Sequence, residues 1–364
     1  MFQTMARPDS SLHGRGAQSG AVSTRFGLAT READGDWRDA AESVDGPGPK
    51  LRTCVTEEFP KSVLSFNRSP DIPFDRSLNP YRGCEHGCIY CYARPTHAWH
   101  DLSPGLDFET KLFAKPSAPE LLRKAFAARG YTPQPLALGT NTDPYQPIEA
   151  RYRITRAVLA LCLEVGHPVT ITTKSARVLD DLDLLTELAR RNLVAVSISV
   201  TSLDPRLSGL LEPRASAPAK RLAALETLTM AGVHAHVSIA PVIPAITDSF
   251  IEAILAEAGA RGVSSASWIM VRLPHEVAPL FCEWLAVHFP DRAAKVTGIV
   301  QSVRAGKDND ARFFSRMEPD GVWADLVRTR FRVGLKRAGI KQIKPVLDCS
   351  QFRAPSRDGQ LALF

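Results

Sequence analysis

The sequence predicts an α/β protein whose parallel sheet forms a partial (β/α)6 barrel, similar to an incomplete TIM barrel. From about residue 76 to residue 288, short apolar runs alternate with amphipathic stretches of ten to fifteen residues. Strands that alternate with helices form parallel sheets, because each helix carries the chain back across the sheet. No Gly-x-Gly-x-x-Gly motif, typical of the open dinucleotide-binding sheet, follows the first predicted strand. The barrel is therefore favoured.

The 364-residue chain divides into three predicted segments. Residues 1–55 are rich in Gly, Ser, Asp and Arg and lack periodic apolar spacing, which predicts a disordered N-terminal tail. Residues 56–290 contain all the β/α units and form the predicted core domain. Residues 291–364 form a basic C-terminal extension with a helix expected at 323–338.

Six β/α units are expected along the core. Each strand is a short, mostly apolar run, which predicts burial on both faces of the sheet, and each helix is an amphipathic stretch. The predicted strands are 77–79, 135–138, 169–173, 193–200, 233–239 and 267–271. The predicted helices are 118–128, 153–165, 179–191, 217–231, 250–260 and 277–288.

Small polar residues follow most of these strands. Active sites of β/α barrels lie at the carboxyl ends of the strands, so this pattern predicts a ligand pocket there. The alternative is that these residues are ordinary strand exits and helix N-caps. The polar ends are 139–143, 172–175, Ser197 with Ser199 and Thr201, 241–244 and Arg272.

Composition and charge narrow the class of protein. Apolar residues make up 44% of the chain and charged residues 23%, as in ordinary globular proteins. No apolar run approaches the roughly 18 residues of a membrane span, and residues 1–20 lack the apolar core of a signal peptide, so we expect a cytoplasmic protein without a membrane partner. The net charge of +6 lies in residues 304–364, which hold thirteen basic and seven acidic residues. This excess indicates either a polyanion-binding surface or a solvated one.

Residues 79–94, here called the cysteine loop, place three of the seven cysteines within eight residues. Cys84, Cys88 and Cys91 are spaced Cys-x3-Cys-x2-Cys, which lets three thiolates converge on one inorganic centre. Three ligands on a four-iron cluster would leave one iron open. Zinc is the rival, with His86 or His97 as a fourth ligand.

The motif Cys84-x3-Cys88-x-Tyr90-Cys91, after the first strand of a β/α chain, resembles that of the radical SAM superfamily. Residues 79–95 and 142–149 resemble the branch related to spore photoproduct lyase, and the likeness extends over about residues 68–274. The resemblance implies a 4Fe-4S cluster on the three cysteines, with S-adenosylmethionine bound to the open iron. One electron from the cluster would release a 5'-deoxyadenosyl radical that abstracts a substrate hydrogen. An electron donor such as flavodoxin or ferredoxin is also implied.

The resemblance also implies contacts to S-adenosylmethionine. Tyr90 matches the aromatic residue near the adenine, and Ser199 matches the ribose contact. Gly139 and Thr140 stand where the family has Gly-Gly-Glu, which meets the methionine amino group.

This chain lacks the second glycine and the glutamate of that motif, and Asp143 is the candidate substitute. Lys174 or Arg272 could neutralise the methionine carboxylate, although Lys174 could instead be a solvated cation.

The substrate is not fixed by the sequence. Spore photoproduct lyase uses a further cysteine as a hydrogen donor, whereas no cysteine lies between Cys91 and Cys162 here and Asn141 or a neighbour takes its place. Tyr145 is a candidate donor or a packing residue. Arginines alternate with Phe and Trp in the C-terminal extension, which predicts nucleic-acid contacts or a helical cap over the open side of the barrel.

Two rival functions stay open. One is a radical SAM enzyme that acts on a protein or a small molecule. The other is a non-enzymatic zinc or iron-sulfur protein that binds nucleic acid. The oligomeric state is not predicted.

Overall fold

A seven-stranded sheet forms the centre of the protein in the computed structural model, which describes residues 15–21, 23, 25 and 52–355. The strand order is β10-β9-β8-β7-β6-β3-β2, in which six neighbouring strands are parallel and β2 (Ser65–Phe66) pairs antiparallel with β3. The α/β prediction is confirmed, because the six parallel strands follow one another in chain order. They are β3 (Arg76–Leu78), β6 (Leu136–Leu138), β7 (Val169–Thr173), β8 (Val194–Ser199), β9 (His234–Val242) and β10 (Ser265–Met270).

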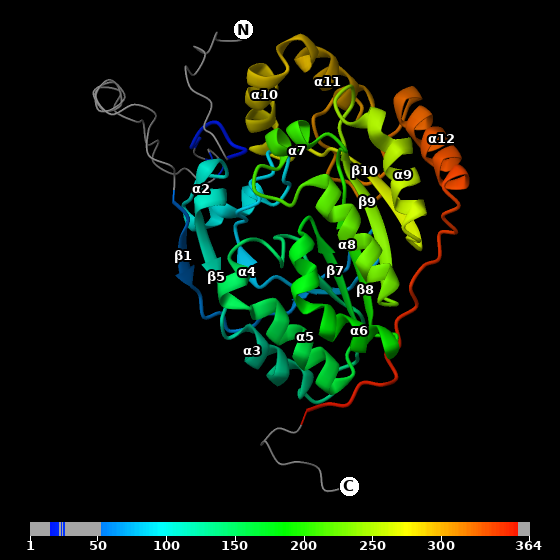
Figure 1. The fold of residues 1–364 in the computed structure, drawn as a ribbon. Helices are drawn as coiled ribbons and strands as arrows, with labels where there is room; N and C mark the ends of the chain where they lie inside the picture. The colour runs from blue at the N-terminus through cyan, green and yellow to red at the C-terminus, as the bar shows by residue number, and fades with distance from the viewer. Residues whose placement is uncertain (1–14, 22, 24, 26–51, 356–364) are drawn as a thin grey trace, which may run out of the picture.

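Helices cover one face of this sheet (Figure 1). Each helix has an apolar stripe, and the stripes pack on the strands to form the main core. Every predicted core helix is present within a few residues of its expected bounds. The helices between the strands are α3 (Ala118–Phe126), α4 (Glu149–Tyr152), α5 (Ile154–Val165), η2 (Ala176–Asp181), α6 (Leu182–Arg190), α7 (Pro205–Leu211), α8 (Pro218–Met230), η3 (Asp248–Phe250) and α9 (Ile251–Ala260).

The two faces of the sheet differ in chemistry. Ile171, Val196 and Val237 are buried in the core against the helices. Their neighbours point to the opposite face, because side chains alternate along a strand. There Thr172 is exposed and His236 is half-buried. The predicted burial on both faces holds for β3 and β6, whose residues are all buried, but not for β7, whose opposite face carries the exposed Thr172.

A second sheet, which the sequence analysis did not predict, carries the cysteine loop. Its strand order is β1-β5-β4, with β1 (Cys54–Glu57) parallel to β5 (Lys111–Ala114) and β4 (Tyr81–Arg82) antiparallel to β5. The cysteines follow β4 directly. The loop then continues into η1 (Arg94–His100) and α2 (Leu106–Thr110).

Part of the segment predicted as a disordered tail, 1–55, has defined contacts. Arg15, Gly16 and Ala17 are buried, and β1 begins at Cys54. The rest of that prediction falls on residues 1–14, 22, 24 and 26–51, which lie outside the described residues.

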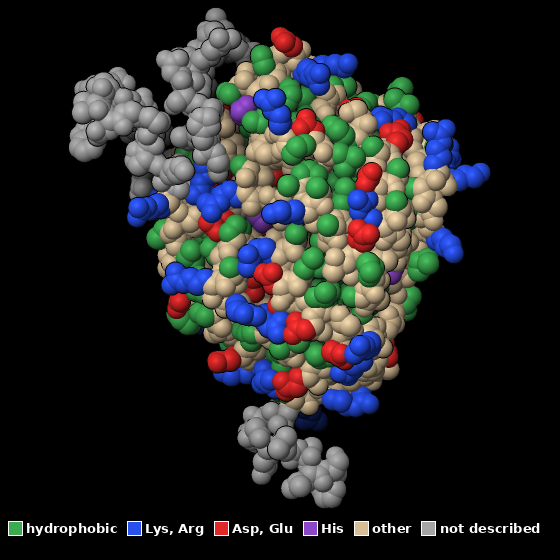
Figure 2. Space-filling view, viewed as in Figure 1, with side chains coloured by type: hydrophobic (Ala, Val, Ile, Leu, Met, Phe, Trp, Pro, Cys, Tyr) green, Lys and Arg blue, Asp and Glu red, His purple; other side chains and the backbone are tan. Residues whose placement is uncertain are grey.

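The last helix of the predicted core is α10 (Val277–His288), and the C-terminal extension contains α11 (Pro290–Ser302) and α12 (Val322–Arg337). Helix α12 lies beside α9 (Figure 1), and Phe331 and Val327 join the main core. The arginines of α12 are partly paired with carboxylates, as in the bidentate contact of Arg330 with Glu252. Figure 2 shows basic side chains along this edge, and acidic and basic side chains interspersed over the rest of that face.

The segment between α11 and α12 connects the two edges of the sheet. Arg304 Nη2 donates to Val271 O, just after β10, at 2.8 Å. Arg316 forms a 2.6 Å ion pair with Asp71, in the loop between β2 and β3. The segment therefore links the end of β10 to the β2–β3 loop, whereas α12, which was predicted as part of a cap, packs beside α9.

After α12 the chain runs across the amino ends of the strands. Gln342 makes two 2.9 Å hydrogen bonds with the backbone of Ala266, Asp348 N donates to Asn192 O at 3.0 Å, and Arg353 N donates to Val165 O at 2.8 Å. Among the described residues, no helix is long and apolar enough to cross a membrane.

Candidate functional site

Two glycines shape the cysteine loop. Gly83 and Gly87 have φ of +70° and +66°, in the left-handed region that glycine adopts readily. The turns are closed by Gly87 N donating to Cys84 O at 3.3 Å and Cys91 N donating to Cys88 O at 3.2 Å. The three cysteines therefore lie on successive turns of one short segment.

Gln146 holds the loop from the side of β6. Its Oε1 accepts from Glu85 N at 2.9 Å, and its Nε2 donates to Gly83 O at 3.1 Å. The sequence analysis did not assign a role to Gln146, although it lies in the family-like stretch 142–149. A buried amide that satisfies two loop backbone groups fixes the start of the cysteine motif.

Arg94 and Glu109 form the second support, and the sequence analysis missed both. Their side chains are completely buried and 2.5 Å apart. Arg94 also donates to the backbone oxygens of Cys88 at 2.9 Å and Gly87 at 3.1 Å. A buried charge requires a partner, so this ion pair fixes the middle of the loop. No sequence signal marks the pair, because fifteen residues separate its members.

The three thiols have the chemistry expected of metal ligands. Cys84 and Cys88 are buried, Cys91 is half-buried, and none of the three is in a disulfide. Burial raises the pKa of each thiol, and the neighbouring Asp143 raises that of Cys84 further. Bound iron would stabilise three such thiolates, so the residues present fit a cluster.

The predicted zinc ligands have other partners. His86 Nδ1 lies 3.3 Å from Asp143 Oδ2. His97 Nε2 lies 2.8 Å from Lys111 O, and its ring packs on Phe108. Within the part of the chain that the structure describes, no three His, Cys, Asp or Glu side chains, the three cysteines included, are grouped closely enough to hold a single metal ion. The cysteine ligands of a four-iron cluster can lie farther apart, because each binds a different iron.

Predicted cofactor residues from three strand ends reach the cysteine loop. Lys174, after β7, lies 5.8 Å from the Tyr90 ring centroid and donates to Ala240 O at 3.3 Å. Arg272, after β10, lies 4.9 Å from the ring centroid of Tyr92. The Tyr92 hydroxyl donates to Thr140 O, after β6. The structure thus brings Tyr90, Thr140, Lys174 and Arg272 together around one loop.

Asp143 has four polar neighbours. It accepts from Thr173 Oγ1 at 2.7 Å, Lys174 N at 2.7 Å and Tyr145 N at 2.9 Å, in addition to its contact with His86. Burial alone would raise the pKa of Asp143, but His86, the Lys174 backbone and the Thr173 hydroxyl lower it. Asp143 therefore joins the ends of β6 and β7 to the cysteine loop.

Gly139 and Ser199 lie at their predicted strand ends. Gly139 has φ of +82°, and a Cβ at this position would lie 2.0 Å from Thr172 O, so only glycine fits. Ser199 is buried as the last residue of β8, and its carbonyl accepts from Arg221 Nη1 at 3.0 Å.

A buried hydrogen-bond network around Glu212 holds the hydroxyl group of Tyr90. Glu212 accepts from the Tyr90 hydroxyl, from Thr201 Oγ1 at 2.6 Å and from Arg221. Burial raises the pKa of Glu212, but Arg221 and Lys174 outweigh burial and lower it to about 2. The sequence analysis missed this pair, because a Glu in a loop and an Arg in a helix are usually solvated.

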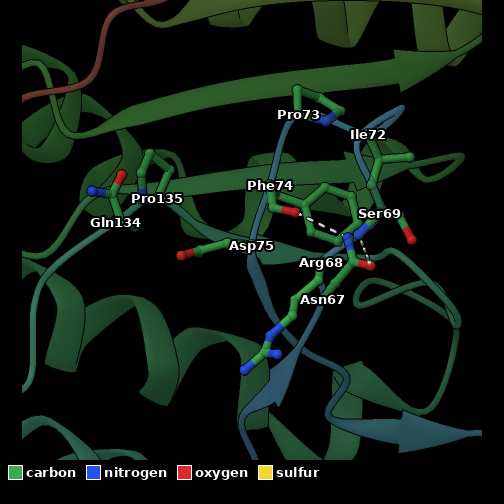
Figure 3. Close-up of a pocket in the computed structure, with 9 residues that line it drawn as sticks. All are labelled: Asn67, Arg68, Ser69, Ile72, Pro73, Phe74, Asp75, Gln134 and Pro135. Atoms are coloured by element: carbon green, nitrogen blue, oxygen red, sulfur yellow. Dashed lines mark hydrogen bonds between the residues drawn. The ribbon is translucent and has the colours of Figure 1, made fainter.

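A pocket of about 390 Å³ lies away from the cysteines. It opens before β3 and β6, at the amino ends of the strands, between residues 67–75 and Gln134 with Pro135. Figure 3 shows the Asn67 amide bonded to Phe74 O and Ser69 N, within the loop itself. The pocket thus lies at the opposite end of β3 from the cysteine loop.

Comparisons with known proteins agree with this geometry. Residues 78–258 match the Radical SAM superfamily. The chain is 35% identical over 240 residues to an uncharacterized protein of Mycobacterium tuberculosis strain H37Rv, covering 65% of this chain and 70% of that protein. It is 29% identical over 181 residues to an uncharacterized protein of Methanocaldococcus jannaschii, covering 50% of this chain and 64% of that protein.

Among solved structures, spore photoproduct lyase complexed with dinucleoside spore photoproduct is similar to this chain. The TM-score is 0.56 at 15% identity, covering 78% of this chain and 79% of that chain. At this identity the likeness shows a shared fold.

Glu212→Gln should destabilise the protein in a pH-dependent way. A carboxyl whose pKa falls from 4.5 to about 2 on folding stabilises the fold above pH 4.5, and this stabilisation is lost as the pH falls toward 2. The expected loss in the free energy of unfolding is about 3 kcal/mol at pH 7. Denaturant titrations of wild type and variant at pH 7, 5 and 3 should show the difference shrinking below pH 4.5.

Glu226→Gln is the control, because Glu226 is exposed on α8. It should change the free energy of unfolding little at any pH. A Glu212→Gln effect that is the same at pH 7 and pH 3 would contradict the assigned ionisation.

Proposed function

Because the chain belongs to the radical SAM superfamily, we propose that it is an enzyme that holds a 4Fe-4S cluster on Cys84, Cys88 and Cys91 and binds S-adenosylmethionine beside it. The observation that carries this proposal is the set of three buried or half-buried, unbridged thiols on one loop at the carboxyl ends of the strands. We also propose that the six parallel strands of the large sheet curve as a partial barrel around this site. Its strands follow one another in chain order, as such a barrel requires.

When bound, the cluster and S-adenosylmethionine supply one-electron cleavage of the sulfonium, which gives a 5'-deoxyadenosyl radical for hydrogen abstraction. The residues of this chain position the reactants and exclude water. Arg94, Glu109 and Gln146 fix the loop backbone, and Asp143 fixes the end of β7 against it. An electron donor of the flavodoxin or ferredoxin type belongs to the same proposal.

Lys174 and Arg272 are the proposed partners of the S-adenosylmethionine carboxylate. Both cations lie against aromatic rings of the cysteine loop, Lys174 after the central strand β7 and Arg272 after the edge strand β10. We assign Tyr90 and Ser199 to the adenosine portion, and Gly139 and Thr140 to the methionine amino group. Asp143 supports these contacts indirectly, because both its carboxylate oxygens already accept hydrogen bonds from backbone or side-chain donors.

Alanine at Cys84, Cys88 or Cys91 should abolish both cluster and cofactor cleavage. Anaerobic reconstitution of the wild type should give about four irons and four sulfides per chain, and reduction should cleave S-adenosylmethionine. Iron and sulfide analysis together with detection of 5'-deoxyadenosine measures both. Cys162→Ala is the control, since Cys162 is buried in α5, away from the loop. Wild-type protein that binds no iron would refute the proposal.

Lys174→Met and Arg272→Met should each weaken S-adenosylmethionine binding about tenfold while the cluster stays intact. The loss of one charge-assisted hydrogen bond explains this size. Equilibrium binding to the reconstituted protein measures it, with the exposed Lys344→Met as the control. If neither variant changes the affinity, the carboxylate is held elsewhere.

Nucleic acid is the substrate class that we propose to test. The aromatic loop (residues 312–316) exposes Phe313 and Phe314 by 52% and 56% of their surface. Arg316 lies 5.0 Å from the Phe313 ring centroid. Burial lowers the pKa of Arg272, and the positive charge of Arg316 lowers it further. Exposed aromatic rings beside arginines can stack on bases and pair with phosphates. The structurally similar spore photoproduct lyase was solved with a dinucleoside spore photoproduct.

Changing both Phe313 and Phe314 to Ala should weaken binding of a single-stranded oligonucleotide at least tenfold, because base stacking contributes about 1–3 kcal/mol per base. Fluorescence anisotropy at several salt concentrations measures this, and affinity should fall as salt rises. Phe59→Ala is the control, because Phe59 is 70% exposed near β1. No salt-dependent binding by the wild type would favour a protein or small-molecule substrate. Zinc in place of iron, with binding retained, would favour the non-enzymatic alternative.

A further inference from the structure

A short N-terminal segment, here called the N-terminal strap (residues 15–19), lies against the cysteine loop. Gly16 N donates to Glu109 Oε2 at 3.0 Å, and Ala17 N donates to Glu109 Oε1 at 2.8 Å. The same carboxylate binds Arg94, which holds Cys88 O. One buried carboxylate therefore joins the strap to the segment that carries the cysteines.

At Gly16 the backbone of the strap packs directly against the backbone of the cysteine loop. A Cβ on Gly16 would lie 1.8 Å from Gly87 O and 3.2 Å from Ile89 N. Ala17 is completely buried and belongs to the same hydrophobic cluster as Cys88 and Ile89. The strap therefore covers the loop between Gly87 and Ile89.

The far end of the strap is also anchored. Ser19 Oγ donates to Glu283 Oε2 on α10 at 3.0 Å, and Ser19 O accepts from Leu106 N at 3.3 Å. At the near end, Arg15 Nη1 donates to Glu109 O at 2.9 Å. These contacts tie the strap to α2 and α10 on either side of the loop.

We infer that the N-terminal strap is a positioning element of the cluster site, which fixes the Cys84–Cys88 turn and shields it from solvent. This inference rests on the proposed function for the identity of the cluster. The strap lies outside residues 78–258, the part of the chain that matches the family.

Shielding has a chemical consequence for the thiolates. Cys88 is 8% exposed with Ala17 packed in its cluster. Displacing the strap would admit water to the Gly87–Ile89 backbone and to this cysteine. Chelators and oxygen would then reach the bound iron faster, without any change in the ligands.

Gly16, in the strap, and Gly20, the residue directly after it, provide a matched test. Gly16→Ala places a methyl group on Gly87 O, whereas Gly20→Ala places one in open space. Hydrogen exchange of the full-length apoprotein and the rate of bleaching of the reconstituted cluster by EDTA in air are measured for both. We expect Gly16→Ala to accelerate exchange at the Ala17 amide and bleaching at least tenfold, and Gly20→Ala to match the wild type.

Equal behaviour of the two variants in both measurements would overturn the inference, as would an unprotected Ala17 amide in the wild type. Faster exchange with unchanged bleaching would also overturn it, because the strap would then be packed without shielding the cluster. A wild type that assembles no cluster overturns the proposed function, and the shielding inference falls with it. Exchange then still reports separately whether the strap packs on the loop.

Discussion

The buried ion pair of Arg94 and Glu109 is the interaction on which the site depends. Removing one partner of such a pair costs about 3–5 kcal/mol, because the other charge is left buried alone. Loss of either partner here would destabilise the cysteine loop. Arg94 donates hydrogen bonds to the backbone of Gly87 and Cys88, and Glu109 accepts hydrogen bonds from the N-terminal strap. The pair thus joins the N-terminal strap, the cysteine loop and α2, and it holds the backbone of the cysteine loop in place.

The loop and the strand ends depend on each other in the same way. Asp143 links the ends of β6 and β7 to His86 inside the cysteine motif, and Glu212 links α8 to Tyr90. Glu212 is buried and Asp143 is only slightly exposed, and each accepts several hydrogen bonds, so each specifies one arrangement of its neighbours. Cofactor contacts proposed for Lys174 and Arg272 are therefore built on a fixed frame.

The sequence predicted the repeating part of this protein well, because periodicity is a local signal. Helix 277–288 has the predicted bounds, and strand 169–173 does too. The cysteine motif was visible for the same reason. The β1-β5-β4 sheet, the Arg94–Glu109 pair and the strap were not predictable, because each depends on contacts between residues far apart in the chain. Polarity on one face of the sheet was missed because the strands looked apolar as a whole.

The apolar face of the sheet packs against the helices, whereas the side chains of the polar face lie outside that core. Ile171, Val196 and Val237 anchor the helices, while Thr172, Ser197 and His236 alternate with them without joining that core. Substitution at the latter positions would leave the core unchanged. Residues on this face can therefore change at a smaller cost to folding than residues on the apolar face.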